Sequence, residues 1–179
     1  MKKSSSFFNL FVGGRICIIV KSYDRVRAVE YARKWALGAN PEFYHFGGIG
    51  GDCTNFISQC LLAGGGVMNF ASPYGWYYNS SYDRSPSWTS VAELQKFLLR
   101  MDGRGPVGKI LPSISGLEIG DLIQLRQNQT HFNHTLIVSK IEGGEIYVCA
   151  HSNDALDRKL SSYQYYALMP LKITGILIK

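Results

Sequence analysis

Residues 134–154 read HTLIVSKIEGGEIYVCAHSND and contain two β-rich runs on either side of a Glu-Gly-Gly turn. Glycines between two runs of β-branched and apolar residues are the usual signal for a β-hairpin. With the turn centred near Gly143, antiparallel pairing places His134 opposite Ser152 and within one position of His151. The sequence therefore predicts an antiparallel hairpin that carries two histidines at its open end.

Three helices are predicted before this hairpin. Apolar residues recur at three- and four-residue spacing in the first of them. The second follows Asp52, a residue type that favours a helix N-cap, and ends in a run of glycines. Ser90 and Glu93 have the spacing of a capping box, which opens the third. These helices are expected over residues 22–37, 53–63 and 90–99.

The remaining strands are expected over residues 122–125 and 168–178, where short apolar or β-branched runs follow turn residues. Glycine and proline punctuate residues 103–116, so this stretch is expected to be irregular. Helices followed by antiparallel strands define the α+β class. The predicted architecture is thus N-terminal helices packed on an antiparallel sheet.

A length of 179 residues fits one domain of ordinary size, and 46% hydrophobic residues can supply its core. We assign residues 22–179 to this domain and residues 1–21 to an N-terminal extension. Within the extension, Ile16, Ile18 and Val20 alternate as in an additional edge strand.

The charge and hydrophobicity of the chain limit the partners that it could have. The net charge of +6 favours anionic partners but selects no class among them. The basic residues form no clustered run or nucleic-acid motif, so nucleic acid is not expected. A spanning helix needs about 20 apolar residues, and no stretch reaches that length, so no integral membrane segment is predicted. No small-residue cleavage site follows the two N-terminal lysines, which disfavours a signal peptide.

The four cysteines, Cys17, Cys53, Cys60 and Cys149, form no CxxC pair and are expected to be free thiols. Cys53 would occupy the first turn of the second helix. Unpaired N–H groups and the helix dipole at that position favour a thiolate, so we expect a lowered pKa and a nucleophilic role. The other three cysteines are expected to be small buried apolar residues.

A catalytic thiol needs a base, and the base needs an orienting group. His134 is the candidate base, because it lies at the polar end of a strand that also brings His151 near. His151 is the second catalytic candidate. Asp154 and Asn153 are alternative orienting residues, although both residue types are also common in solvated turns.

The same residues could be considered as metal ligands. His131 and His134 are three residues apart near a strand start, but helix-borne HxxxH or HExxH spacing is absent, so no metal is predicted. His131 and His45 are interpreted as loop residues. The glycine-rich stretch before Cys53 matches neither phosphate-binding motif, and no cofactor is expected.

A long aromatic segment over residues 67–87 contains Trp76, Tyr77 and Tyr78 without helical or strand periodicity. Loops of this length commonly carry function. We consider two interpretations, namely that these aromatic side chains line a substrate groove and that they pack over the sheet.

GGDCTNF at residues 50–56, HTLIVSKI at 134–141 and YVCAHSND at 147–154 together carry a resemblance to a known family. Residues 22–178 resemble the "Putative amidase domain" found in many spore-forming bacteria, which is grouped with the papain-like cysteine peptidases beside the CHAP and NlpC-type cell-wall hydrolases. The resemblance implies a papain-like fold, a catalytic Cys53 at a helix N-terminus and His134 as general base. It implies His151 or Asp154 as the third catalytic residue.

The resemblance further implies hydrolysis of an amide bond in a peptide or in peptidoglycan, with a cell-wall or spore association. Two alternatives remain open at this stage. A transglutaminase-like acyl transferase would use the same cysteine and histidine, whereas a catalytically silent wall-binding module would use only the aromatic groove. The sequence predicts no oligomeric state.

Overall fold

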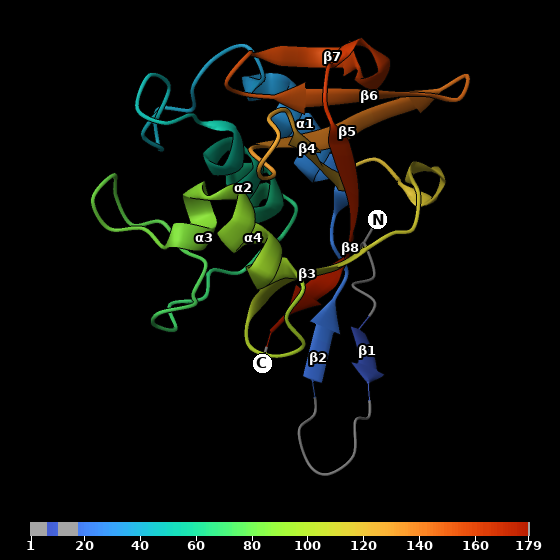
Figure 1. Cartoon of the computed structure of the whole chain (residues 1–179). Coiled ribbons are helices and arrows are strands. Elements are labelled where there is room, and N and C mark those ends of the chain that lie inside the picture. The colour runs from blue at the N-terminus through green and yellow to red at the C-terminus, as the bar shows by residue number, and fades with distance from the viewer. Residues whose placement is uncertain (1–6, 11–17, 179) are drawn as a thin grey trace.

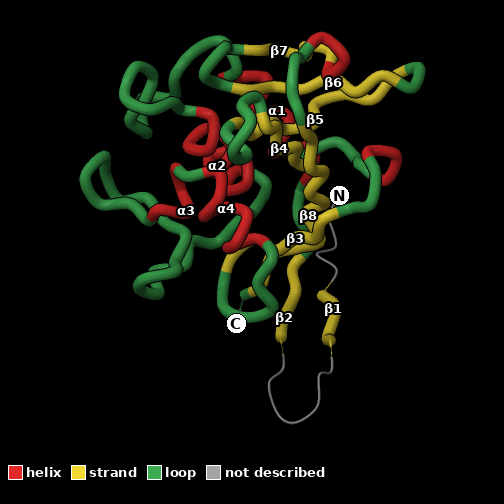
Figure 2. Tube along the Cα trace, viewed as in Figure 1, coloured by secondary structure: helices red, strands yellow, loops and turns green. Residues whose placement is uncertain are grey.

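The structure is a computed structural model that describes residues 7–10 and 18–178 (Figure 1). Its described part combines helices with an antiparallel sheet, which confirms the predicted α+β class. Three of the α-helices, over residues 53–63, 86–89 and 91–98, lie together on one side of the strands (Figure 2). The described helices are α1 (Arg25–Trp35), α2 (Cys53–Ala63), α3 (Pro86–Thr89) and α4 (Val91–Leu98), with short 3-10 turns at Ile114–Gly116 and Leu160–Ser162.

The eight described strands form one sheet in the order β1-β2-β8-β4-β5-β6-β7, and β3 pairs with β8 outside this path. All of these pairings are antiparallel. The strands are β1 (Phe7–Leu10), β2 (Ile18–Lys21), β3 (Gly105–Ile110), β4 (Leu122–Arg126), β5 (His134–Glu142), β6 (Glu145–Ala150), β7 (Ala155–Lys159) and β8 (Ala167–Leu177).

The three predicted helices are confirmed, with ends that differ by a few residues from the prediction. The Asp24 side chain caps α1 by accepting a hydrogen bond from the backbone of Arg27. Helix α2 begins at Cys53, as the sequence predicted. The Ser90 hydroxyl accepts a hydrogen bond from the backbone N–H of Glu93 and so caps α4.

The hairpin of β5 and β6 has the predicted register near its open end, where Ile137 faces Cys149 and Val138 faces Val148. Gly143 and Gly144 both have positive φ, which a tight turn between twisted strands requires. The register shifts only on the side nearer the turn.

Strands β1, β3 and β7 were not predicted from the sequence. Strand β3 falls in the stretch that was expected to be irregular, and its sequence, GPVGKI, contains two glycines and a proline. Its extended form is stabilised by pairing with β8 rather than by local propensity. Strand β7 has the charged sequence ALDRK and lies at the edge of the sheet, so it shows no apolar run.

The end of the predicted N-terminal extension joins the sheet, because Val20 and Lys21 of β2 pair with β8. Of the alternating residues proposed for an edge strand, Ile16 lies outside the described residues. Cys17 also lies outside them. Among the described residues, no helix is long and apolar enough to cross a membrane.

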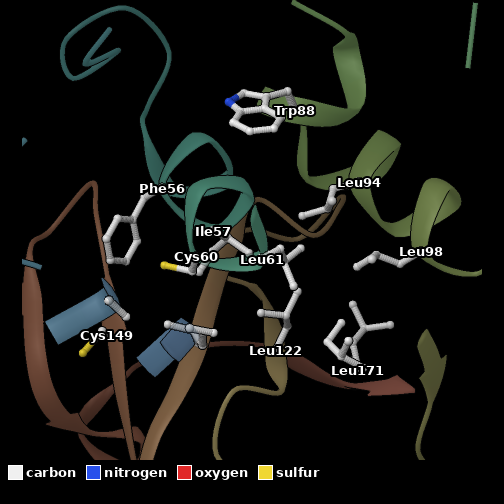
Figure 3. Packing of buried hydrophobic residues seen from close by; sticks show 14 of the residues in the cluster. Phe56, Ile57, Cys60, Leu61, Trp88, Leu94, Leu98, Leu122, Cys149 and Leu171 are labelled. Carbon is white, nitrogen blue, oxygen red and sulfur yellow. The ribbon is translucent and has the colours of Figure 1, made fainter. Parts of the chain in front are cut away.

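Two apolar clusters lie on opposite faces of the sheet. In the helix-side cluster, Phe56, Ile57 and Leu61 of α2 pack against residues of the central strands, including Leu122 and Leu171 (Figure 3). The other cluster contains alternate residues of the same strands, together with Leu160 and Tyr163 after β7; from the strands it contains Ile123, Leu125, Leu136, Val138, Ile146, Val148, Ala150 and Ala155. This packing holds the N-terminal end of α2 against the start of β5.

Candidate active site

Cys53 occupies the first turn of α2 and is 7% exposed. Its sulfur lies near the backbone of Thr135 in β5 and 3.8 Å from the hydroxyl oxygen of Thr54. The hydroxyl oxygens of Thr54 and Thr135 are 3.4 Å apart. The start of α2 and the start of β5 therefore meet at Cys53. The residue of β5 that meets it, Thr135, directly follows His134.

The pKa of the Cys53 thiol is raised rather than lowered, which contradicts the prediction from the helix dipole. Burial raises this pKa, and the hydrogen bonds from Thr135 and Thr54 lower it by less. Removing the sulfur from water disfavours the charged thiolate more strongly than the contacts with Thr135 and Thr54 favour it. The resting cysteine is consequently a neutral thiol.

His134 is 3% exposed, and its ring centroid lies 6.3 Å from that of Tyr163. The Nε2 atom of His134 is buried and has no hydrogen-bond partner among the described residues. Burial lowers the pKa of His134 to about 4, and the positive charge of Arg158 contributes in the same direction. At neutral pH this imidazole is therefore uncharged, and its lowered pKa makes it a weaker base than a free imidazole.

His151 has a different environment. Its Nδ1 lies 2.6 Å from Oδ2 of Asp52, and its Nε2 lies 2.8 Å from the carbonyl oxygen of Trp35. Its ring also stacks on Phe56 with a centroid separation of 4.0 Å. Burial lowers the pKa of His151, but the hydrogen bonds to Asp52 and Trp35 raise it, and the net effect is a raised pKa. A carbonyl and a carboxylate both accept hydrogen bonds, so this geometry suits an imidazolium that donates from both nitrogens.

The structure places both histidines at one end of the hairpin but on opposite faces of the sheet. His134 contacts Tyr163 of the outer cluster, whereas His151 stacks on Phe56 of the helix-side cluster. The cause is the alternation of side chains along a strand. In this register Ser152 would lie directly opposite His134, so His151, the residue next to Ser152, points to the other face. His151 makes no hydrogen bond to His134.

Asp52 has a role that the sequence did not reveal. It occupies the N-cap position of α2, as expected, but its side chain makes no capping bond. The carboxylate instead accepts hydrogen bonds from His151, the backbone N–H of Phe46 and the amide of Asn55. Only alternation along β6, applied together with the register, could have indicated that His151 faces this helix.

Asp154 and Asn153 lie exposed in the turn between β6 and β7. The carboxylate of Asp154 makes no hydrogen bond within residues 18–178, so it does not orient His134 in this structure. Ser152 makes the contact in this turn, since its hydroxyl oxygen accepts a 2.6 Å hydrogen bond from the backbone N–H of Asp52. The turn therefore holds the residue that precedes Cys53.

His45 also lies near this pair, with its Nε2 3.8 Å from Oδ2 of Asp52. Three side-chain atoms that could bind a metal ion lie within 4.8 Å of one another, one each from His45, Asp52 and His151. A cation could bind His151 only if that ring gave up one of its two hydrogen bonds. His131 is exposed, and its Nδ1 lies 2.8 Å from the hydroxyl of Thr130.

The interpretation of Trp76 as a groove residue is wrong. Its side chain is 0% exposed and belongs to the helix-side core, and its indole N–H donates to the hydroxyl of Ser58 in α2. Tyr77 and Tyr78 are half-buried. Tyr77 stacks on Phe70, and the hydroxyl of Tyr78 accepts a hydrogen bond from the backbone N–H of Tyr44. The aromatic segment thus packs over the helices.

An α+β domain whose second helix begins with a buried cysteine at the start of a central strand is the class that the fold and the site define. Residues 22–174 match the family model described as "Putative amidase domain", and the chain belongs to this family. The family name indicates an amidase, which is a hydrolase of amide bonds.

Two relatives are proteins of Bacillus subtilis (strain 168). The chain is 37% identical over 153 residues to the protein described as "Uncharacterized protein YhbB", which covers 83% of this chain and 47% of the relative. It is 28% identical over 146 residues to "Uncharacterized protein YjcM", which covers 77% of this chain and 33% of the relative. The chain thus spans half or less of the length of these relatives. No solved structure matches it.

Proposed function

We propose that this protein is a cysteine-dependent amidohydrolase in which Cys53 is the nucleophile and His134 the general base. The observation that carries the proposal is the contact between the Cys53 sulfur and the backbone of Thr135, which brings the first turn of α2 to the residue next to His134. The family to which the chain belongs supports amide chemistry.

The pKa directions favour a neutral thiol and a neutral imidazole over a resting ion pair. Cys53 would transfer its proton to His134 as the sulfur attacks the carbonyl carbon of the amide, and His134 would return that proton to the departing amine. Water, activated by His134, would then release the acid and restore the thiol. No hydrogen bond joins the two side chains, and His134 lies on the face of the sheet opposite α2, so the mechanism requires the start of β5 to rearrange and turn the His134 ring towards Cys53 when substrate binds.

The first turn of α2 would stabilise the developing negative charge. Backbone N–H groups at the start of a helix have no intrahelical partners, and the helix dipole is positive there. When Cys53 attacks the carbonyl carbon, the negative charge that develops on the carbonyl oxygen would lie beside these groups. In this proposal His151 is a positioning residue, because its bond to Asp52 fixes the backbone immediately before the nucleophile.

The substrate in this proposal is a peptide amide, and peptidoglycan stem peptides are the first candidate. The resemblance to cell-wall hydrolases and the net charge of +6, which would favour an anionic wall polymer, support this choice. Acyl transfer by the same residues would appear as product formation only in the presence of an added amine.

The test measures the release of free amines from a library of N-acetylated dipeptide amides and from purified peptidoglycan. We expect Cys53→Ala to abolish the release and His134→Gln to lower the rate by on the order of 10³-fold. Matched controls are Cys60→Ser, which alters a buried thiol of the same helix, and His131→Gln, which alters an exposed histidine. Full activity in Cys53→Ala would overturn the proposal.

A further inference from the structure

A polar pocket of about 450 Å³ lies on the face of the sheet that His134 occupies. It is formed by the residue after β4, the turn after β6, strand β7 and the segment that follows it. Its lining side chains all carry polar groups, one of them is a cation, and none is acidic; they are Gln127, Asn153, Arg158, Ser162, Tyr163 and Gln164. This composition suits an anionic polar ligand rather than an apolar one.

Arg158 is held in place but not neutralised. Its Nε donates a 3.0 Å hydrogen bond to the hydroxyl of Ser162, and its guanidinium carbon lies 4.4 Å from the ring centroid of Tyr163. Within the described part of the chain, its two terminal nitrogens have no hydrogen bond or ion pair. Arg25 and Arg33, in contrast, pair with aspartates. An oriented guanidinium with free N–H groups matches the two oxygens of a carboxylate.

The pocket adjoins the proposed base through Tyr163. This tyrosine lines the pocket, and its ring contacts that of His134. Its hydroxyl is buried without a hydrogen-bond partner among the described residues. Buried polar groups are normally satisfied, so the unpaired Tyr163 hydroxyl, next to the exposed guanidinium of Arg158, indicates that a ligand completes the site.

We propose that this pocket binds a carboxylate of the substrate through Arg158, so that the enzyme prefers amides of acylated amino acids or peptides with a free carboxylate near the scissile bond. This inference rests on the proposed function for the identity of the reaction, and it adds the substrate class and the residue that selects it. A bound carboxylate would also offset the charge of Arg158, which is one cause of the low pKa of His134, and would thereby make the base stronger.

The binding test does not depend on turnover. The Cys53→Ala chain is titrated with N-acetyl-alanyl-alanine and with the same peptide as its C-terminal carboxamide, and binding is followed by NMR. We expect the carboxylate to bind at least about tenfold more tightly than the carboxamide. Adding Arg158→Gln should remove this preference, whereas Lys159→Gln, which removes an exposed charge from the neighbouring residue of the same strand, should leave it.

The imidazole resonances of His134 provide a second readout that a structural role for Arg158 would not move. Its pKa should rise when the carboxylate peptide binds, and this rise should be absent in Arg158→Gln. Equal binding of the two peptides, or equal losses in the Arg158 and Lys159 variants, would overturn the inference.

Turnover separates this inference from the proposed function. Cys53-dependent hydrolysis without a preference for carboxylates would overturn only the pocket. Arg158-dependent binding of the carboxylate together with hydrolysis that survives Cys53→Ala would overturn only the nucleophile.

Discussion

His134 and His151 lie at the same end of one hairpin, but they differ in every contact that determines what an imidazole does. His151 binds Asp52 and the Trp35 carbonyl through its two nitrogens and stacks on Phe56. His134 has a buried nitrogen without a partner and lies beside a polar pocket. A fully bonded side chain positions its surroundings, whereas an unsatisfied one is available for chemistry.

The electrostatics of the two rings differ in the same way. Burial and Arg158 lower the pKa of His134 to about 4. Burial also opposes the charge on His151, but hydrogen bonds to Asp52 and Trp35 outweigh it and raise that pKa. The presence of a bonded carboxylate is therefore what separates a charged structural histidine from a neutral base.

The strongest way to break this comparison is to remove Asp52. We expect Asp52→Ala to lower the free energy of unfolding by about 4 kcal/mol, because it leaves His151 buried without its ionic partner. Urea unfolding at neutral pH measures the change. Asp154→Ala, in the exposed turn, serves as the matched control and should change stability by less than about 0.5 kcal/mol. Equal effects of the two variants would show that the buried pair has no special role.

The pH dependence of stability should separate the two histidines. Because the folded pKa of His134 lies below the unfolded value, the folded state binds fewer protons in acid, and stability falls as pH drops from about 6.5 to about 4. This fall in the free energy of unfolding should reach about 3 kcal/mol. The variant His134→Gln should remove it, whereas His131→Gln should retain it. Denaturant unfolding at several pH values across this range measures the free energy of unfolding.

His151 should make stability depend on pH in the opposite direction. Its folded pKa is raised, so its contribution is complete below the unfolded value and is lost as pH rises through the folded value. The loss should be smaller, because burial partly cancels the hydrogen bonds. An alkaline loss that persists unchanged in His151→Gln would contradict the assignment.

The smallest expected effect concerns the thiol. Since burial raises the pKa of Cys53, iodoacetamide should label it about tenfold more slowly than a small free thiol near neutral pH, and the rate should increase in alkali. Labelling that is lost in Cys53→Ala and retained in Cys60→Ser assigns the signal to Cys53. Faster labelling than the free thiol would indicate a thiolate and would remove the contrast between this neutral pair and the charged Asp52–His151 pair.

Local sequence was sufficient for much of the scaffold. The start of α2 at Cys53 follows from Asp52 and the apolar run after it, and the register of Ile137 with Cys149 follows from the double-glycine turn. Both depend on signals within a few residues, namely capping preference and turn geometry. The resemblance to the amidase family is likewise carried by short motifs around these elements, and the family model matches residues 22–174.

Tertiary structure decided the chemistry of the same residues. Alternation of side chains within a packed sheet, not register alone, places His151 against Asp52 and His134 against Tyr163. Burial reversed the pKa direction expected for Cys53 at a helix N-terminus. Cross-strand pairing, contact with distant side chains and exclusion of water all join parts of the chain that are far apart, and no local pattern encodes them.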